Sequence, residues 1–122
     1  MGQRPYVLIV DDDVQVADYL RDTLESASYR AASTTSGRKA LSLIRERRPD
    51  LLILDLNMPE PDGFDLLKIE RAELPYLRIL VISGYLEGAM LAAAKLVGAT
   101  ATLQKPISPE DLVAKVKEIL GK

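Results

Sequence analysis

Three acidic side chains of this chain stand directly after short apolar runs. Asp11 and Asp12 follow the run Val7-Leu8-Ile9-Val10, and Asp55 ends the run that begins at Leu51. Short runs rich in Val, Ile and Leu are typical of strands buried on both faces of a parallel sheet. Because neighbouring parallel strands end on the same side of a sheet, we expect all three carboxylates to gather in the crevice at that edge.

A cluster of carboxylates predicts a bound cation. Two like charges about 4 Å apart repel by roughly 4 kcal/mol at an effective dielectric of about 20, so such a cluster requires protonation or a cation. Hard divalent ions prefer oxygen ligands, and Mg2+ usually retains several waters. We therefore predict a Mg2+ site that includes Asp11, Asp12 and Asp55.

The composition excludes several classes of chemistry. The chain has 122 residues and contains neither cysteine nor histidine, which excludes thiol catalysis, histidine acid–base chemistry and His/Cys zinc sites. Its net charge of -2 gives no general attraction to nucleic acid. No apolar stretch approaches about 18 residues and no basic leader precedes a hydrophobic segment. We expect a cytoplasmic protein without direct nucleic-acid or membrane contacts.

Apolar runs and helical patterns alternate along the chain. Strands are predicted near Tyr6–Val10, Tyr29–Ser33, Asp50–Asp55, Arg78–Ser83 and Ala99–Leu103. The last helix is expected to begin with Ser108 as its cap and Pro109 at its first position. This pattern predicts a (βα)5 fold, a doubly wound, flavodoxin-like five-stranded parallel sheet with strand order 2-1-3-4-5. We expect one domain over residues 1–122, with no room for a second.

A hydroxyl and an ammonium group complete the constellation. Ser83 closes the predicted fourth strand, and Lys105 closes the fifth just before Pro106. In-line attack of a carboxylate on a phosphoryl group leaves charge on three equatorial oxygens, which a metal, a lysine and a hydroxyl can stabilise. We predict Asp55 as the nucleophile, because it stands on a different strand from Asp11 and Asp12, so one of its oxygens can bind the metal while the other attacks.

Four motifs in order at the strand ends resemble those of the receiver domain of two-component response regulators. They are Ile9-Val10-Asp11-Asp12, Leu54-Asp55-Leu56-Asn57-Met58-Pro59 followed by Asp62-Gly63, Val81-Ile82-Ser83-Gly84, and Leu103-Gln104-Lys105-Pro106. The resemblance covers essentially the whole chain. Within the second motif, Pro59 is expected to fix the backbone, and Gly63 to adopt a conformation that other residues resist.

The resemblance implies a role for each site residue. Asp55 would be the phospho-acceptor, Asp12 a direct Mg2+ ligand and Asp11 a metal-site residue acting mainly through water. Asn57 would give its backbone carbonyl to the metal. Asp13, by contrast, is interpreted as the N-cap of the first helix.

Further implications concern the switch and its partners. Ser83 would be the switching hydroxyl, Lys105 would bind the phosphoryl oxygens, and the bond before Pro106 would be cis. A sensor histidine kinase or histidine phosphotransfer protein would donate the phosphoryl group, and output would pass to a downstream protein. The domain would catalyse only its own phosphorylation and slow hydrolysis, so we class it as a signalling switch rather than an enzyme.

The chain departs from the family pattern around the predicted switch. Thr102 stands where most receivers have Tyr or Phe, so the usual aromatic rotamer switch cannot operate. Gly84 and Ile107 replace a common Ala and Phe, and Tyr85 lies two residues beyond Ser83. Activation is therefore expected to involve Ser83, Gly84, Tyr85 and the start of the fourth helix, with glycine supplying backbone freedom.

The predicted fourth helix, roughly Leu86 to Val97, carries few charges on its outer face. Its apolar residues there are Ala89, Ala92, Ala93 and Leu96. One interpretation is a contact surface for a partner or for a second copy in a homodimer. The other is that alanine simply favours helix and the stripe packs against a neighbour.

Two other hypotheses for the whole chain stay open at this point. The sequence could be a receiver excised from a larger regulator with a C-terminal output domain, which the gene beyond Lys122 would reveal. It could instead be a flavodoxin-like binding module that never carries phosphate. A phosphorylation assay separates the second hypothesis from a receiver.

Overall fold

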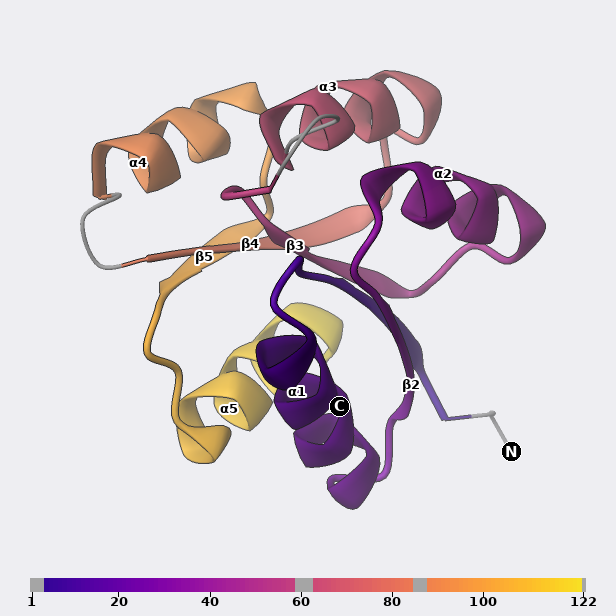
Figure 1. Ribbon diagram of the computed structural model, residues 1–122, viewed down its shortest axis with the longest axis vertical. Coiled ribbons are helices and arrows are strands. Elements are labelled where there is room, and N and C mark those ends of the chain that lie inside the picture. The colour runs from indigo at the N-terminus through magenta and orange to yellow at the C-terminus, as the bar shows by residue number, and fades with distance from the viewer. Residues whose placement is uncertain (1–3, 59–62, 85–87, 122) are drawn as a thin grey trace.

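The protein folds around one parallel sheet flanked by two layers of helices (Figure 1). The computed structural model describes residues 4–58, 63–84 and 88–121. The strands are β1 (Tyr6–Val10), β2 (Arg30–Thr34), β3 (Leu51–Asp55), β4 (Arg78–Ser83) and β5 (Ala101–Gln104). The helices are α1 (Val14–Ser26), α2 (Gly37–Glu46), α3 (Gly63–Glu73), α4 (Gly88–Val97) and α5 (Pro109–Leu120). The sheet order β2-β1-β3-β4-β5 confirms the predicted topology.

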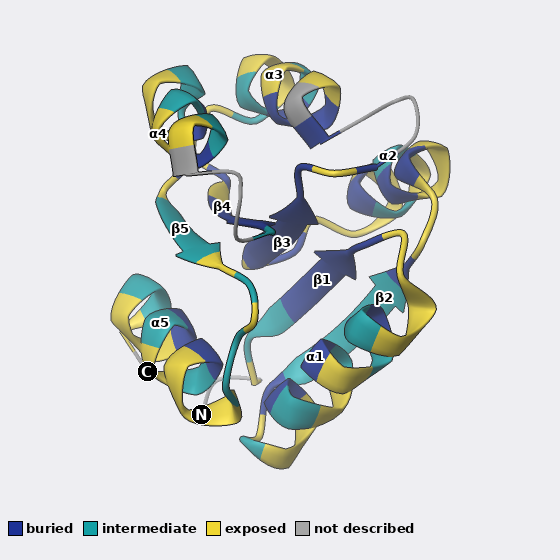
Figure 2. Cartoon of the chain, turned by 60° about the vertical axis from the view of Figure 1, so that its left-hand side comes forward, coloured by how far each residue is buried: buried dark blue, intermediate teal, exposed yellow. Residues whose placement is uncertain are grey.

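The central strands are buried on both faces, as their continuous apolar runs predict. Leu8 and Val10 of β1 belong to the core cluster that includes residues of α2, α3 and α4, whereas Val7 and Ile9 belong to the cluster that includes residues of α1 and α5. This alternation follows from the two-residue period of a strand. Figure 2 shows β1, β3 and β4 as mostly buried. Their carboxyl ends therefore form a rigid base for any side chain placed there.

The strands β2 and β5 begin later than the sequence predicts, because helix ends occupy the expected residues. The Tyr29 amide donates to the Leu24 carbonyl at 3.0 Å and so extends the end of α1, which delays β2 to Arg30. Likewise, the Ala99 amide donates to the Ala94 carbonyl of α4 at 3.0 Å. β5 consequently begins two residues later than predicted, at Ala101 rather than Ala99.

The predicted helix caps are confirmed. Asp13 Oδ1 accepts hydrogen bonds from the amides of Gln15 at 3.0 Å and Val16 at 3.3 Å. Ser108 caps α5, with Pro109 as its first residue. Such caps satisfy amides that have no partner within the helix. Within the described ranges, no helix is both long and apolar enough to cross a membrane.

The outer face of α4 is exposed. Ala89 and Ala92 are exposed, and Leu96 is 91% exposed. The helix instead buries Leu91 and Ala94 against the sheet. The interpretation that the apolar stripe of this helix packs against a neighbour is therefore wrong for Leu96, which contacts solvent in the described part of the chain. The predicted start of this helix at Leu86 lies outside the described residues.

Candidate functional site

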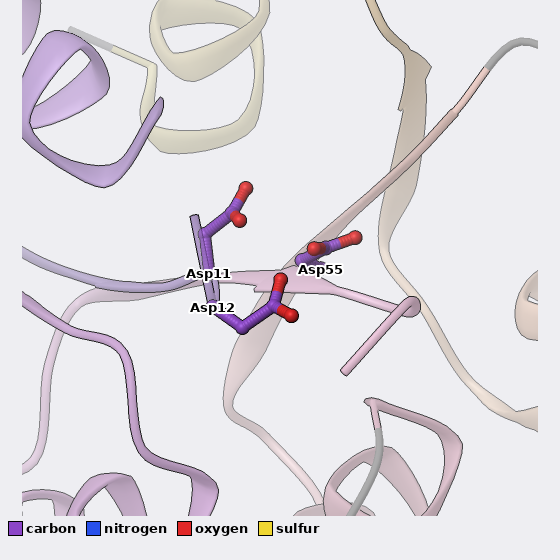
Figure 3. A group of neighbouring side chains, drawn as sticks. All are labelled: Asp11, Asp12 and Asp55. Carbon is purple, nitrogen blue, oxygen red and sulfur yellow. The ribbon is translucent and has the colours of Figure 1, made fainter. Parts of the chain in front are cut away.

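The predicted acids meet at the carboxyl edge of the sheet. The chain order reverses between β1 and β3, and ligands of open α/β sheets bind in the crevice at such a point. Asp11 and Asp12 follow β1 in the loop to α1, and Asp55 ends β3 (Figure 3). One oxygen of each of the three carboxylates lies within 4.8 Å of the others.

The three acids have different environments. Asp11 is 0% exposed and Asp55 is 1% exposed, whereas Asp12 is exposed. Asp11 Oδ1 accepts a hydrogen bond from the Asp13 amide at 2.9 Å, and Asp55 Oδ1 accepts one from the Asn57 amide at 3.1 Å. A backbone amide thus orients one oxygen of each buried carboxylate, and the second oxygen of each faces the Lys105 ammonium.

Lys105 connects the two buried acids. Its Nζ lies 2.9 Å from Asp11 Oδ2 and 3.5 Å from Asp55 Oδ2. Burial lowers the pKa of Lys105, but the hydrogen bonds and negative charges of Asp11 and Asp55 outweigh that effect, so its pKa is raised overall. The ammonium group therefore stays charged at neutral pH beside the carboxylates.

Among the acids that the structure describes, Asp55 has the most strongly shifted pKa. Burial and the negative charge of Asp11 raise its pKa to about 6, against the opposing effects of the Asn57 amide and the Lys105 ammonium. The carboxyl is mostly ionised at pH 7, but the Asn57 amide and the Lys105 ammonium do not fully offset the cost of burying its negative charge. A shifted group in a crevice, beside a specific charged partner, is typical of a functional site.

Ser83 contributes a buried hydroxyl with no partner. The residue is 0% exposed, and its Oγ makes no hydrogen bond within the described part of the chain. β4 pairs with β3 so that Ile82 lies opposite Asp55, which places Ser83 one residue beyond the acceptor. The Lys105 amide donates to the Ser83 carbonyl at 2.6 Å, so the hydroxyl and the ammonium come from adjoining chain segments.

These groups fit a divalent cation and a phosphoryl group. The donor set of three carboxylates is all oxygen, which suits Mg2+. Unpartnered buried polar groups require an explanation, and the Ser83 hydroxyl would gain an acceptor if a phosphoryl oxygen lay beside Asp55. Asn57 adjoins the cluster through its backbone, although the structure gives a contact for its amide only.

Gly63 corrects one expectation. Positive φ angles occur among the described glycines at Gly98 and Gly121, not at Gly63, so the prediction of an unusual backbone conformation was wrong. The reason for glycine is close approach instead: a Cβ there would lie 2.3 Å from the Asp55 carbonyl oxygen and 2.4 Å from Leu56 Cα. The start of α3 therefore rests directly on the backbone of the candidate acceptor.

Some of the remaining predictions concern residues that the structure describes, and others concern residues that it does not. The Lys105-Pro106 bond is cis, as expected. Thr102, which stands where the resemblance would imply Tyr or Phe, lies half-buried in β5. Pro59, Asp62 and Tyr85 lie outside the described residues.

Comparisons with known proteins agree with this geometry. A family model described as the response regulator receiver domain matches residues 7–117. The DNA-binding response regulator MtrA of Mycobacterium tuberculosis H37Rv is 32% identical over 114 residues, which are 93% of this chain and 50% of that protein. The chain thus spans about half the length of the curated relatives it matches.

Two solved structures are similar over nearly their whole length. A response-regulator structure from Chloroflexus aurantiacus J-10-fl has a TM-score of 0.91 and 36% identity, and covers 98% of this chain and 99% of that one. The chemotaxis protein CheY4 of Vibrio cholerae has a TM-score of 0.89 and 32% identity, covering 96% and 99% of the two chains. With its sheet order, its acidic edge and these matches, the chain belongs to the receiver-domain family of two-component response regulators.

Proposed function

We propose that this receiver domain is a phosphorylation-dependent signalling switch in which Asp55 accepts the phosphoryl group. Asp11, Asp12, Asp55 and the Asn57 carbonyl would hold Mg2+, and Lys105 would bind phosphoryl oxygens. The observation that carries the proposal is the position of Asp55: it is 1% exposed, lies among the metal-type acids and has the Lys105 ammonium 3.5 Å away.

The transfer is a simple displacement. A bond forms between an Asp55 carboxylate oxygen and phosphorus, while the phosphorus–nitrogen bond of a phosphohistidine breaks and the imidazole leaves with the electron pair. Mg2+, when bound, would supply positive charge to the phosphoryl oxygens. Asn57 orients the nucleophile through its amide, and Lys105 neutralises charge that develops on the equatorial oxygens.

The donor is proposed to be a sensor histidine kinase or a histidine phosphotransfer protein, and an apolar hollow beside the site supports docking of such a protein. The hollow has a volume of about 320 Å³ and is lined by Val16, Tyr19, Leu20, Gly84, Lys105, Pro106 and Ile107. The Tyr19 hydroxyl donates to the Ile107 carbonyl at 2.9 Å and so joins its two walls. Because Lys105 belongs both to the hollow and to the site, a donor seated there would hold its phosphohistidine near Asp55.

One labelling experiment tests the proposal. The protein is incubated with acetyl phosphate or phosphoramidate, with and without Mg2+, and its intact mass is measured before peptide mapping. The proposal requires Mg2+-dependent addition of one phosphoryl group at Asp55. Absence of labelling would favour the alternative of a flavodoxin-like binding module that carries no phosphate.

The two N-terminal acids should differ in their importance for the metal. Asp12→Ala is expected to weaken Mg2+ binding about tenfold more than Asp11→Ala, because Asp12 is exposed toward the site while Asp11 is already engaged by Lys105 at 2.9 Å. Calorimetric Mg2+ titration measures the order. Asp13→Asn is the matched control, since it changes a neighbouring acid that caps α1 instead. Equal losses, or a larger loss for Asp11→Ala, would contradict the assignment of direct and water-mediated ligands.

Output is proposed to pass by protein contact through the exposed face of α4, to a downstream partner or to a second copy of the chain. Leu96→Glu should leave phosphorylation of Asp55 unchanged but disrupt association, because it places a charge on an apolar surface that is 91% exposed. Sedimentation and partner pull-down, each with and without beryllofluoride, measure the effect. Tyr76→Glu is the control, since Tyr76 is 93% exposed in the connection from α3 to β4. Unchanged association in Leu96→Glu would require an output surface elsewhere.

A larger regulator remains a second candidate. MtrA, which is described as DNA-binding, is about twice as long as the stretch it shares with this chain. We propose that residues 1–122 form a single receiver domain acting in the cytoplasm. The gene sequence beyond Lys122 distinguishes a stand-alone regulator from a receiver that precedes an output domain.

A further inference from the structure

One arginine side chain joins the end of α3 to the end of α4. Arg71 donates hydrogen bonds to the Gly98 carbonyl from Nε at 3.1 Å and from Nη2 at 2.7 Å. Its Nη1 donates to the carbonyls of Pro75 and Leu77 at 2.8 Å each, in the turn that leads to β4. Figures 1 and 2 both show α3 beside α4. A single guanidinium group therefore ties three chain segments together at the amino edge of the sheet.

The backbone at Gly98 fits this contact. Gly98 directly follows α4 and has φ +129°, and glycine with positive φ commonly ends a helix. A Cβ there would lie 2.9 Å from Arg71 Nε and 3.1 Å from Arg71 Cγ, so the arginine occupies the space that glycine leaves. A positive charge at this end of α4 also complements the helix dipole.

The segments that Arg71 ties are the two ends of one structural unit. β4 runs to the carboxyl edge of the sheet, and α4 returns to the amino edge. Arg71 closes the base of this unit, together with the Thr100 amide, which donates to the Ile79 carbonyl of β4 at 2.8 Å. The tip of the unit carries Ser83, whose buried hydroxyl has no hydrogen-bond partner within the described ranges.

We infer that Arg71 is a positioning residue that anchors the C-terminal end of α4, so that the helix turns about this end when Asp55 is phosphorylated. The inference rests on the proposed function, in which a phosphoryl group beside Asp55 would give the Ser83 hydroxyl an acceptor. That change acts at the tip of the unit, whereas Arg71 fixes its base. Among the described residues of α4, Leu91 and Ala94 are the buried ones, so packing between the two ends opposes the movement weakly.

A pivot at Gly98 predicts a gradient of movement along the exposed face of α4. A rise of about 1.5 Å per residue places Ala89 about 13 Å and Leu96 about 3 Å from Gly98 along the helix, so Ala89 should move roughly fourfold further. Both residues are exposed. A partner that contacts Ala89 would therefore respond to the phosphorylation state more strongly than one that contacts Leu96 alone.

Spin-label distances measure this gradient. The chain contains no cysteine, so Ala89→Cys and Leu96→Cys can each be labelled selectively and paired in turn with Asp22→Cys on α1 and Arg38→Cys on α2. Beryllofluoride with Mg2+ should shift the distances from Ala89→Cys by about 2 Å, and those from Leu96→Cys by less than half as much. Equal shifts, a larger shift at Leu96→Cys, or no shift in a protein that acetyl phosphate labels, would overturn the inference. A protein that is never labelled would refute the proposed function as well.

Arg71→Met tests the anchor itself. Methionine keeps an unbranched stem but has no donor, so the C-terminal end of α4 should be released. The Gly98 amide, which donates to the Ala94 carbonyl at 3.0 Å, should then exchange with deuterium at least about tenfold faster than in the parent. The beryllofluoride shift at Leu96→Cys should rise to match the shift at Ala89→Cys, while labelling of Asp55 by acetyl phosphate persists.

Lys95→Ala is the matched control at the same end of α4. Lys95 Nζ donates to the Thr100 carbonyl at 3.1 Å, which follows its own helix and does not belong to α3, so the parental gradient should persist. A parental gradient in a folded Arg71→Met protein would refute the anchoring role. Arg71→Lys, which keeps the charge but lacks the planar fork of donors, gives the same comparison if Arg71→Met does not fold.

Discussion

Asp55→Asn is expected to abolish labelling by acetyl phosphate in the presence of Mg2+. The amide is a poor nucleophile, and no other acid that the structure describes at this edge is placed as Asp55 is: Asp11 is held by Lys105 at 2.9 Å, and Asp12 is exposed. The fold should persist, because the Asn side-chain oxygen can still accept the hydrogen bond that Asn57 donates to Asp55 Oδ1. Intact-mass measurement of parent and variant under the same conditions gives the result.

A matched control separates loss of the acceptor from loss of a hydrogen-bonded carboxylate beside β3 in general. Asp50→Asn alters a carboxylate that accepts a hydrogen bond from the Tyr6 amide at 2.7 Å, at the amino end of β1. That variant should be labelled like the parent. Normal labelling of Asp55→Asn, or a phosphoryl group mapped to Asp11 or Asp12, would show that the acceptor had been assigned to the wrong carboxylate.

The fold was largely predictable because its signals are local or repeated. β1 and β3 are buried on both faces, so their apolar runs identify them without knowledge of the partners. Asp13 and Ser108 cap helices through neighbouring amides, an arrangement that is visible in the sequence. The start of β5 was not predictable, since Thr100 is fixed by hydrogen bonds with Ile79 on β4, contacts made only in the folded chain.

For the site, the sequence could predict which residues lie together, but not which charges pair most closely or which pKa is shifted. Parallel strands end together, so Asp11 and Asp55 had to be neighbours once β1 and β3 were identified. Nothing in the order of residues indicates that the Lys105 ammonium lies closer to Asp11 than to Asp55. The rise of the Asp55 pKa to about 6 likewise depends on burial and on Asp11 across the sheet.

Glu70 illustrates the same limit away from the site. In the sequence it is an ordinary acid within an amphipathic helix, and such residues usually face solvent. Its complete burial depends on how α2 lies against α3. The nearby Arg45 guanidinium pairs instead with Glu73, one turn later in α3. A sequence pattern reports which face of a helix is apolar, but not which charge is trapped where two helices meet.

Gly63→Ala is expected to destabilise the protein by about 3 kcal/mol or more. The added Cβ would lie 2.3 Å from the Asp55 carbonyl oxygen and 2.4 Å from Leu56 Cα, and both atoms belong to the backbone at the end of a buried strand. Backbone there cannot yield as a flexible side chain does, so α3 must shift away from β3 and lose packing. Urea denaturation monitored by circular dichroism measures the change in the free energy of unfolding.

Gly84→Ala is the matched control for the same substitution at the same edge of the sheet. Among the described residues, the nearest neighbour of a Cβ at Gly84 is Asn57 Nδ2 at 4.0 Å, and Gly84 has no positive φ. The variant's stability should therefore be within about 1 kcal/mol of the parent's. A Gly63→Ala variant as stable as Gly84→Ala would mean that α3 can move at little cost. The start of α3 would then be a movable element beside the acceptor rather than a fixed support for it, and phosphorylation of Asp55 could displace it.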